Sequence, residues 1–595
     1  MRKTKKLVTT LLIPSVIAST ILSGCGGNNS QNPTTTAPAP TTTASGGSSN
    51  NNQTTTVADT SNAPWELLDS LNKKEGDALT TPRSNYLTYP VDSSEATQTL
   101  RYWMELPGNV SKNSASCNDT EWARLWQEAT GIKIEFIHPT QGSAQEEFGV
   151  LIASGTLPDV IEWEWTNSYT GGPAAAAKEG VLTILDDYIK PDGLAADLWQ
   201  YLQDNPIIDR EIKNDDGNYY CFPFIRGDKY LQTTSGPLYR ADILKKAGYE
   251  GELITIADWT AALTAAKEYG VAKPLAFQDA NYLMNFGISA YGIRNAMYVD
   301  AETGKVKNGA MEEGYKQWIL QMNEWMDAGL LDSEVMTKVG RSVIDSQILT
   351  GATLATYGAG GGYLGTYLTT AKADPATYGE DFDVRAANFP VLNKGDVVMY
   401  GGGSYDYATT SKAHAVITED CKVPELAVKL LNFNYSEKGH KLINFGEEGK
   451  SYTLVNGVPT YTDEVMKNPN GLSVAVAMAH WGRGNMNGPF VQDPNYIIQY
   501  YETEQQKEAL SIWNDETDNQ KTCIPPVTLT EEESKRYTVL NGQIDTYITE
   551  QRTKFITGEA DVEAEWDNYI ATLKSLGMEE MISIQQAAVD RFNAR

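Results

Sequence analysis

The sequence predicts an α/β fold built on parallel, doubly wound sheets. Strand-like and helix-like segments alternate from Thr97 onward, which is the pattern of parallel strands joined by crossover helices. The chain has 595 residues, 41% of them apolar, and about 530 residues follow a low-complexity N-terminal region. This length allows two or more domains with sizeable cores.

The first strand and helix units lie between Thr97 and Gly180. Apolar residues mark three expected strands, at Leu100 to Met104, Ile132 to Phe136 and Pro158 to Trp165. Three helices are expected around them, from an Asp119 cap to a Gly131 stop, from Ser143 to Ser154, and from Pro173 to Gly180. Ligands of such sheets bind beyond the carboxyl ends of the strands, which here are residues 105–109 and 163–169.

Later segments continue the pattern. Residues 215–218 predict a turn, residues 219–226 a strand, and residues 239–242 the start of a helix. Further helices are expected at 315–329, 424–431 and 436–446. Near the C-terminus, Thr530 and Glu533 form a capping box before one helix, and a last pair of helices is expected at 562–576 and 584–592.

The N-terminus predicts an exported protein that is held by lipid. Basic residues from Arg2 to Lys6 precede an apolar run from Leu7 to Leu22, which is too short for a spanning helix, so residues 1–24 are interpreted as a signal peptide. Leu22-Ser23-Gly24-Cys25 resembles the bacterial lipobox, in which the cysteine is acylated. Cys25 is therefore the expected lipidation site. The alternative is an ordinary cleaved signal with an incidental cysteine.

Residues 25–64 are interpreted as the lipidated cysteine followed by a disordered tether. After Cys25 the segment is almost only Gly, Ser, Thr, Asn, Gln, Ala and Pro, with Asp59 as its sole charge. Such a composition cannot bury enough apolar surface to offset its conformational entropy. A flexible coil of this length spans about 35 Å, so the tether lets a folded body move above a membrane.

Charge and cysteine usage exclude some classes of partner. The net charge is −29, which disfavours nucleic acid or an anionic membrane surface as the main ligand. The remaining cysteines, Cys117, Cys221, Cys421 and Cys523, lack the paired spacing of a zinc site. Two disulfides and four free thiols are equally compatible with the sequence.

Aromatic usage is compatible with sugar binding. The chain has 32 Tyr and 13 Trp but only 13 Phe, so most aromatic side chains carry a polar group. Sugars stack on such rings while carboxylates, amides and arginines hydrogen-bond their hydroxyls. Glu162-Trp163-Glu164-Trp165 places tryptophans and carboxylates on alternate faces of an extended segment, where each tryptophan either contacts ligand or packs in the core. A Tyr-rich surface is also common in exported proteins.

The motifs of common enzymes and cofactor sites are weak or missing. Residues 360–365 match the GxGxxG spacing, but we expect a tight strand-to-helix turn near a cleft rather than a nucleotide site. Gly449-Lys450-Ser451 fails as a phosphate loop because Asn444 stands at the required upstream glycine. The four histidines are scattered, and no EF-hand pattern occurs. We therefore expect no catalytic residues, no cofactor and no metal site.

An ordered set of segments spans the chain from about Thr97 to Arg595. The segments are 153–161, 171–173, 222–226, 236–242, 324–330, 424–427, 435–439, 444–449 and 554–558. Together they resemble the family 1 extracellular solute-binding proteins, the lipoprotein substrate-binding components of carbohydrate ABC importers.

The resemblance implies a two-lobed periplasmic-binding-protein-like fold of type II. Each lobe is expected to be a doubly wound sheet flanked by helices, with a helical C-terminal extension. The first lobe would comprise residues 96–225 plus 404–465, and the second 226–403 plus 466–595. The glycine clusters 360–362 and 401–403 would lie in cleft or hinge loops.

The expected ligand contacts combine the strand ends with the lobe crossovers. They are Glu105, Asn109, Trp163, Trp165, Arg226, Tyr239, Trp481 and Arg483. Arg226 has a lobe-bracing ion pair as its alternative role, and Trp481 has a core position as its alternative.

The resemblance implies a binding protein rather than an enzyme. A monomer anchored on the extracellular face of the bacterial cytoplasmic membrane would capture an oligosaccharide between its lobes and deliver it to ABC permease subunits. The alternatives are a surface-anchored glycoside hydrolase, and a receptor of the same fold for a peptide or another solute.

Overall fold

Two four-stranded sheets organise the chain, each with its own hydrophobic core. The computed structural model describes residues 79–337, 339–401, 408, 414–515 and 517–595, all within one compact unit that begins at Ser61. The expected signal peptide, the lipidation site Cys25 and the tether to residue 64 lie outside the described residues. We call the body around the first sheet the first lobe and the body around the second sheet the second lobe.

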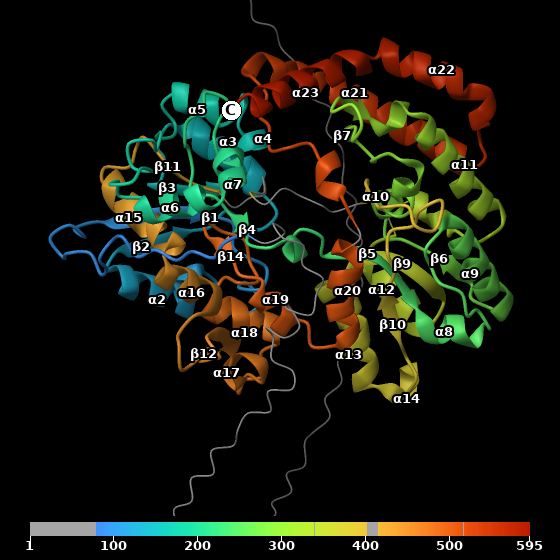
Figure 1. The fold of residues 1–595 in the computed structure, drawn as a ribbon, viewed down its shortest axis with the longest axis horizontal. Helices are drawn as coiled ribbons and strands as arrows, with labels where there is room; N and C mark the ends of the chain where they lie inside the picture. The colour runs from blue at the N-terminus through green and yellow to red at the C-terminus, as the bar shows by residue number, and fades with distance from the viewer. Residues whose placement is uncertain (1–78, 338, 402–407, 409–413, 516) are drawn as a thin grey trace, which may run out of the picture. The chain divides into compact units, whose positions relative to one another are not determined.

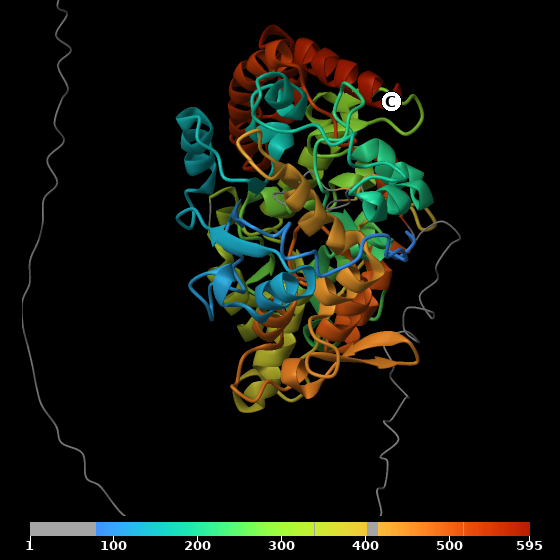
Figure 2. The ribbon, with the colours of Figure 1, turned by 90° about the vertical axis from the view of Figure 1, so that its left-hand side faces the viewer.

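The first sheet confirms the predicted parallel strands (Figure 1). Its strand order is β11-β3-β1-β2, and β1 runs parallel to both β2 and β3, whereas β11 is antiparallel to β3. The strands are β1 (Thr99–Met104), β2 (Lys133–Ile137), β3 (Val160–Trp163) and β11 (His414–Ile417). Figure 2 turns this lobe toward the viewer.

Eight helices belong to the chain segments that carry these strands. They are α2 (Glu121–Thr130), α3 (Ala144–Ser154), α4 (Trp165–Ser168), α5 (Gly172–Lys178), α6 (Ala196–Asp204), α7 (Pro206–Glu211), α15 (Pro424–Asn432) and α16 (Glu437–Phe445). Helix α2 is capped by Thr120, whose hydroxyl accepts from the Ala123 amide, and not by Asp119 as expected. Gly131 ends this helix with a left-handed backbone, as the sequence predicts.

Two expected strands are shorter in the structure. β3 ends at Trp163 because the Glu164 carboxylate caps α4 by accepting from the Asn167 amide, which turns the chain into a helix. Of residues 219–226, only β4 (Ile225–Arg226) forms a ladder. β4 pairs in parallel with β14 (Val491–Gln492), so two segments distant in sequence run side by side.

The second sheet is mixed rather than wholly parallel. Its strand order is β10-β5-β9-β6, with β6 and β9 parallel and β5 antiparallel to both β9 and β10. The strands are β5 (Ser235–Arg240), β6 (Lys273–Leu275), β9 (Thr353–Ala359) and β10 (Val384–Ala386). Tyr239 and Arg240 end β5 in extended conformation, so the helix expected from residue 239 begins two residues later, at Ala241.

Helices and a short hairpin surround the second sheet. The helices are α8 (Ala241–Lys246), α9 (Ile256–Tyr269), α10 (Ala280–Asn285), α11 (Glu313–Asp327), α12 (Arg341–Thr350), α13 (Thr366–Ala373), α14 (Pro375–Tyr378) and α20 (Glu504–Asn514). The hairpin pairs β7 (Met297–Val299) with β8 (Val306–Asn308). Helix α11 buries Tyr315, Trp318, Met322 and Trp325 on one face, as their spacing predicts.

The segment after β11 stays with the first lobe longer than expected. Ala479, Met486, Phe490 and Val491 are buried in the same core as β1. The expected return to the second lobe at residue 466 is therefore wrong for residues 479–491. The elements here are β12 (Tyr452–Val455), β13 (Val458–Tyr461), α17 (Asp463–Met466), α18 (Val474–Trp481) and α19 (Asn495–Tyr500).

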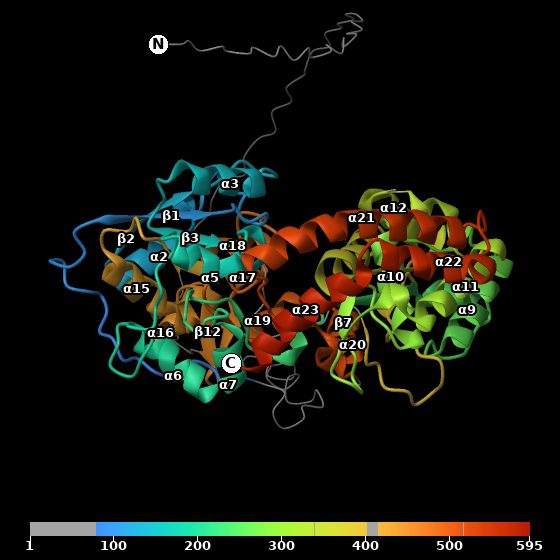
Figure 3. The ribbon, with the colours of Figure 1, turned by 90° about the horizontal axis from the view of Figure 1, so that it is seen from above.

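Three helices form the C-terminal extension: α21 (Glu531–Ile556), α22 (Val562–Ser575) and α23 (Met578–Asn593) (Figure 3). The expected capping box is present, with the Thr530 hydroxyl accepting from the Glu533 amide and the Glu533 carboxylate accepting from the Thr530 amide. Phe555, Tyr569, Leu573 and Met578 join the core of the second lobe.

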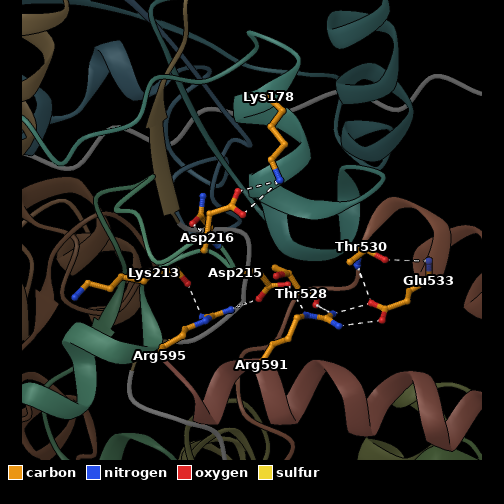
Figure 4. Close-up of polar contacts among 10 residues, drawn as sticks. Lys178, Lys213, Asp215, Asp216, Thr528, Thr530, Glu533, Arg591 and Arg595 are labelled. Carbon is orange, nitrogen blue, oxygen red and sulfur yellow. Dashed lines mark hydrogen bonds and ion pairs between the residues drawn. The ribbon is translucent and has the colours of Figure 1, made fainter.

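The extension is also tied to the first lobe through the turn at residues 213–217 (Figure 4). Arg591 binds Asp215 at 3.2 Å and forms two hydrogen bonds to Glu533. Arg595 pairs with the same Asp215 and donates to the Lys213 carbonyl. We call this group of contacts the C-terminal clasp. None of the described helices is long and apolar enough to cross a membrane.

Candidate ligand-binding site

Glu105 and Asn109 follow β1, at the edge where the parallel strands of the first sheet end. Both are half-buried, and the Asn109 side-chain oxygen accepts from Lys112 at 3.1 Å. His138, just after β2, braces this edge by donating from Nδ1 to the Met104 carbonyl and accepting the Cys117 amide at Nε2. Burial lowers the pKa of His138, which favours this neutral form. Glu105 and Asn109 remain predicted ligand contacts.

Trp163 and Trp165 are core residues, which corrects their expected role. Both are fully buried. Trp163 packs edge-on against Trp103 at 5.4 Å, and Trp165 packs edge-on against Phe148 at 5.2 Å. Side chains on both faces of β3 are buried, so the alternation of side chains along this strand leaves no face on which a tryptophan could contact a ligand.

Arg483 is also structural rather than a ligand contact. It is 1% exposed and pairs with Glu162 through two hydrogen bonds of 2.6 and 3.2 Å. Glu162 also accepts from the Tyr102 hydroxyl at 2.7 Å, and the Arg483 guanidinium lies 5.0 Å from the ring of Trp122. The ion pair joins β3 to the segment after α18 inside the first lobe.

The other three expected contacts lie in separate places. Arg226 on β4 donates to the Gln492 side chain at 3.2 Å across the pair with β14. Trp481 is half-buried at the end of α18 and packs against a small core that includes Phe445 and Tyr496, which favours its alternative as a core residue. The eight predicted residues are therefore not gathered into one site.

Tyr239 lies away from the expected binding edge of the second sheet. It pairs with Ala355 of β9, four residues before the strand ends at Ala359. At 3.3 Å per residue this places Tyr239 about 13 Å from that end. Its ring packs on Trp259.

Tyrosines and amides gather where β6 and β9 end. The Tyr363 hydroxyl donates to the Gln278 side chain at 2.6 Å and lies 3.3 Å from the Tyr282 hydroxyl. The Arg341 guanidinium lies 4.2 Å from the centre of the Tyr363 ring. Asp279 caps α10 by accepting from the Asn281 and Tyr282 amides. These residues form a polar, aromatic edge, which sequence reasoning missed because they lie far apart in the chain.

Residues 360–365 form a π-helical turn from β9 into α13, as the predicted strand-to-helix turn requires. A Cβ at Gly360 would lie 2.7 Å from the Tyr501 hydroxyl, and one at Gly361 would lie 2.9 Å from the Tyr500 ring. Glycine is required there because two tyrosines cover the backbone. Of the second glycine cluster, residues 402 and 403 lie outside the described residues.

A cavity of about 630 Å³ opens beside this edge, between α10, the β7–β8 hairpin and the helices α21 and α23. Its polar lining residues are Asp279, Asn281, Asn295, Asn308, Thr337, Tyr537, Asn541, Asp545, Thr549, Arg552 and Gln585. Its apolar lining residues are Ala280, Met284, Ala296, Met297, Met336, Ile524, Ile544, Ile548 and Met581. The volume suits a small ligand of several rings.

The cavity offers binding chemistry. Amide and carboxylate oxygens accept from hydroxyls, amide and guanidinium groups donate to them, and the methionines and isoleucines contact apolar faces. Among the residues that the structure describes, no group of three or more His, Cys, Asp or Glu is arranged to hold a metal ion. Cys117, Cys221 and Cys421 form no disulfide, and burial raises the pKa of Cys117 and of Cys421 to about 12, so these two thiols stay protonated at neutral pH.

Two sheet-centred lobes are also the architecture of solved solute-binding proteins. The family model of the bacterial extracellular solute-binding proteins matches residues 118–441, more than half of the chain. The chain belongs to this family. A comparison with curated protein sequences gives no match.

Solved structures of solute-binding proteins share the two-lobed fold. The alginate-binding protein AlgQ2 aligns with a TM-score of 0.64 and 22% identity, over 87% of this chain and 100% of that one. An HMO-binding, ABC-transporter-associated protein from Bifidobacterium longum infantis aligns with a TM-score of 0.64 and 18% identity, over 83% and 99%. The binding protein FusA of Streptococcus pneumoniae, in complex with kestose, aligns with a TM-score of 0.61 and 21% identity, over 84% and 100%.

Proposed function

We propose that this protein is a lipid-anchored receptor that captures an oligosaccharide and delivers it to the permease of an ABC importer. The observation that carries the proposal is the 630 Å³ cavity, whose lining mixes carboxylates, amides, an arginine and a tyrosine with methionines and isoleucines. Sugars need this mixture, because each ring presents both hydroxyls and apolar C–H faces.

The neighbouring edge of the second sheet supports a sugar ligand. The ring centre of Tyr282 lies 5.9 Å from that of Tyr357 and 6.2 Å from that of Tyr363. Tyr282 is half-buried, so its ring and hydroxyl can contact a sugar, whereas Tyr357 and Tyr363 are buried and support it from behind. Solved structures of the same fold include proteins named for alginate and HMO binding, and one in complex with kestose.

The proposed ligand contacts combine both lobes. Glu105, Asn109 and Arg226 would contribute from the first lobe, and the cavity from the second. A ligand that touches both stabilises the closed arrangement only as far as it binds that arrangement more tightly than the open one. Closure removes water from the polar contacts, and the closed receptor then docks on the permease as a monomer.

Calorimetric titration of the full chain against a panel of neutral and acidic oligosaccharides tests the proposal. Binding at micromolar or lower dissociation constants, with the sugars recovered unchanged after long incubation, is the expected result. Cleavage of any glycan, or binding of peptides in place of sugars, would refute it.

The anchor has a separate test. Cys25→Ser removes the only thiol available for acylation in the Leu-Ser-Gly-Cys segment. The variant should bind sugar with unchanged affinity but leave the membrane fraction of cells, because stable anchoring needs acyl chains. Retention of the variant on membranes would exclude lipidation at Cys25.

A further inference from the structure

One buried cation in the second lobe lacks the partner that other buried arginines have. The arginines buried among the described residues are Arg240, Arg483 and Arg552. Arg240 pairs with Asp242 at 2.8 Å and Arg483 with Glu162 at 2.6 Å. Arg552 has no carboxylate within 4.0 Å in the described part of the chain.

The existing contacts of Arg552 are weak. One terminal nitrogen lies against the sulfur of Met284, and thioether sulfur is a poor acceptor. The other donates to the Thr549 hydroxyl at 3.5 Å, the limit of a hydrogen bond. The Nε–H group is buried and has no hydrogen-bond partner among the described residues, and the whole residue is only 6% exposed. A buried guanidinium whose N–H groups lack strong acceptors lowers the stability of the fold, because its lost hydration is not replaced, unless an acceptor such as a ligand group binds it.

Arg552 lines the 630 Å³ cavity. Asp545, two helical turns earlier, and Asn541 lie on the same face of α21 and also line it. Asp545 is exposed, whereas Arg552 is buried, so the two differ in their access to water. The cavity therefore has a part near Asn541 and Asp545 whose side-chain oxygens can accept from ligand hydroxyls, and a cationic part at Arg552.

Two buried tyrosines lie near the guanidinium. Tyr315 on α11 and Tyr569 on α22 are each 1% exposed, and the Tyr569 hydroxyl has no hydrogen-bond partner among the described residues. Burial raises the pKa of both phenols, and the charge of Arg552 opposes this rise, which indicates that the guanidinium is close to both. Like Arg552, both tyrosines have a hydrogen to donate.

We propose that the ligand carries a carboxylate that binds Arg552, which makes the preferred solute an oligosaccharide with an acidic sugar unit. This inference rests on the proposed function and specifies its substrate class. A carboxylate matches the planar guanidinium and accepts charge-assisted hydrogen bonds, which are stronger than those a neutral hydroxyl accepts. The neutral part of the ligand would extend along α21 toward Asn541.

The acidic lining does not oppose this assignment. The Asp279 carboxylate already caps α10 and also accepts from the side-chain amide of Gln278 at 3.2 Å. The net charge of −29 repels anions at long range, but salt at physiological strength screens charges beyond about 8 Å. Binding at Arg552 acts at contact distance, where screening is weak.

The test compares uronate-containing oligosaccharides, their carboxyl-reduced forms and neutral oligosaccharides by calorimetry on the full chain. The wild type should bind an acidic ligand about 10- to 100-fold more tightly than its reduced form, because a hydrogen bond to a charged group is lost. Arg552→Gln should remove most of that difference, because it weakens binding of the acidic ligand more than binding of its reduced form.

Arg536→Gln is the matched control, because Arg536 lies on the same helix but is exposed and pairs with Glu580 outside the cavity. It should bind every ligand like the wild type. Arg552→Lys keeps the positive charge but loses the planar guanidinium, so its preference for the acidic over the reduced ligand should lie between those of the wild type and Arg552→Gln. It replaces Arg552→Gln as the test if circular dichroism shows that Arg552→Gln does not fold.

The outcomes separate the two proposals. Equal affinity for acidic and reduced ligands, or an unchanged preference in both Arg552 variants, would overturn the assignment of Arg552 and leave the oligosaccharide receptor intact. Binding of neutral sugars alone would have the same consequence. If no oligosaccharide binds at all, the proposed function itself fails.

Discussion

Removing the Arg483 guanidinium should destabilise the first lobe strongly. In Arg483→Met, Glu162 keeps its buried position, 4% exposed, but loses two hydrogen bonds of 2.6 and 3.2 Å and its only counterion within 4.0 Å in the described residues. Breaking a buried ion pair from one side costs about 3–5 kcal/mol, because an uncompensated charge stays in the interior. We expect the free energy of unfolding to fall by that amount.

Urea unfolding at neutral pH, followed by tryptophan fluorescence, measures this loss. Trp122 lies 5.0 Å from the guanidinium and reports on the same core. The double variant Glu162→Gln/Arg483→Met should recover at least half of the loss, because the amide no longer carries a charge and still accepts from Tyr102. Arg536→Met, which breaks an exposed pair with Glu580, is the control and should have little measurable effect.

The same variants distinguish a structural role from a ligand contact. If Arg483→Met were as stable as the wild type but lost its affinity for sugar, Arg483 would contact ligand, and the reasoning from burial would be refuted. A double variant that is no more stable than Arg483→Met would show that the loss comes from packing around the arginine rather than from the unpaired charge.

Four further substitutions test other parts of the fold by urea unfolding. Gly542→Ala should stabilise the protein by about 1 kcal/mol, because Gly542 is exposed inside α21 with open space around its Cα; no gain would mean that this part of α21 is not helical. Gly439→Ala should cost about 3 kcal/mol, because its Cβ would lie 1.7 Å from the Phe433 carbonyl oxygen, and a neutral result would contradict this packing. Thr530→Ala removes the cap of α21 and should cost about 1 kcal/mol, whereas Thr530→Ser should not. A hydrogen bond from Thr303, with the nearby Lys307, lowers the pKa of Asp300 to about 2. Asp300→Asn should therefore cost roughly 1 kcal/mol at pH 7, after screening by solvent at this surface hairpin, and less as the pH falls from about 4 toward 2. A loss of stability that is the same at pH 3 as at pH 7 would argue against a role of the carboxylate charge.

Local patterns predicted the helices well because their signals are local. Thr530 and Glu533, Ser436, Pro424 and the glycine stop at Gly131 act within one helical turn, and the structure confirms each of them. Strand ends were less predictable. Residues 219–226 look extended in sequence, but only Ile225 and Arg226 form a described strand, whose partner β14 is 266 residues away, and Phe222 forms a single bridge to Ala415 of β11.

The predicted site was less accurate because burial depends on distant segments. In the sequence, Trp163 and Trp165 are equally compatible with a core position and with a ligand contact. Their burial in one hydrophobic cluster with Phe148 shows that they are core residues. Arg483 meets Glu162 across 321 residues, so no spacing could show the ion pair. The high tryptophan content proves to be mainly a core property, since Trp122, Trp126, Trp259, Trp318, Trp325 and Trp513 are fully buried as well.

The cavity face of α21 was present in the sequence but ambiguous. The capping box predicted the helix, whereas no motif in the sequence marks Asn541, Asp545 or Arg552 as cavity residues. Only the packing of α11 and α22 against α21 shows that Arg552 is buried. A charged residue on the polar side of an amphipathic helix, such as the proposed ligand contact Arg552, is thus not singled out by sequence alone.

Helix α21 connects the cavity to the first lobe. Its first residue, Glu531, lies so close to Gly171 that a Cβ there would be 3.2 Å from the Glu531 Cα, and the C-terminal clasp joins Glu533 and Asp215 through Arg591. The cavity residues of α21 lie between Tyr537 and Arg552. This stretch has 16 positions and is about 24 Å long at 1.5 Å per residue. A rigid helix of this length transmits displacement at one end to the other. Movement of the first lobe relative to the second must therefore either shift the cavity face of α21 or break the clasp. If the proposed ligand binds along α21, ligand and lobe arrangement influence each other, which is the coupling that the proposed receptor would need for a permease to distinguish its loaded state from its empty one.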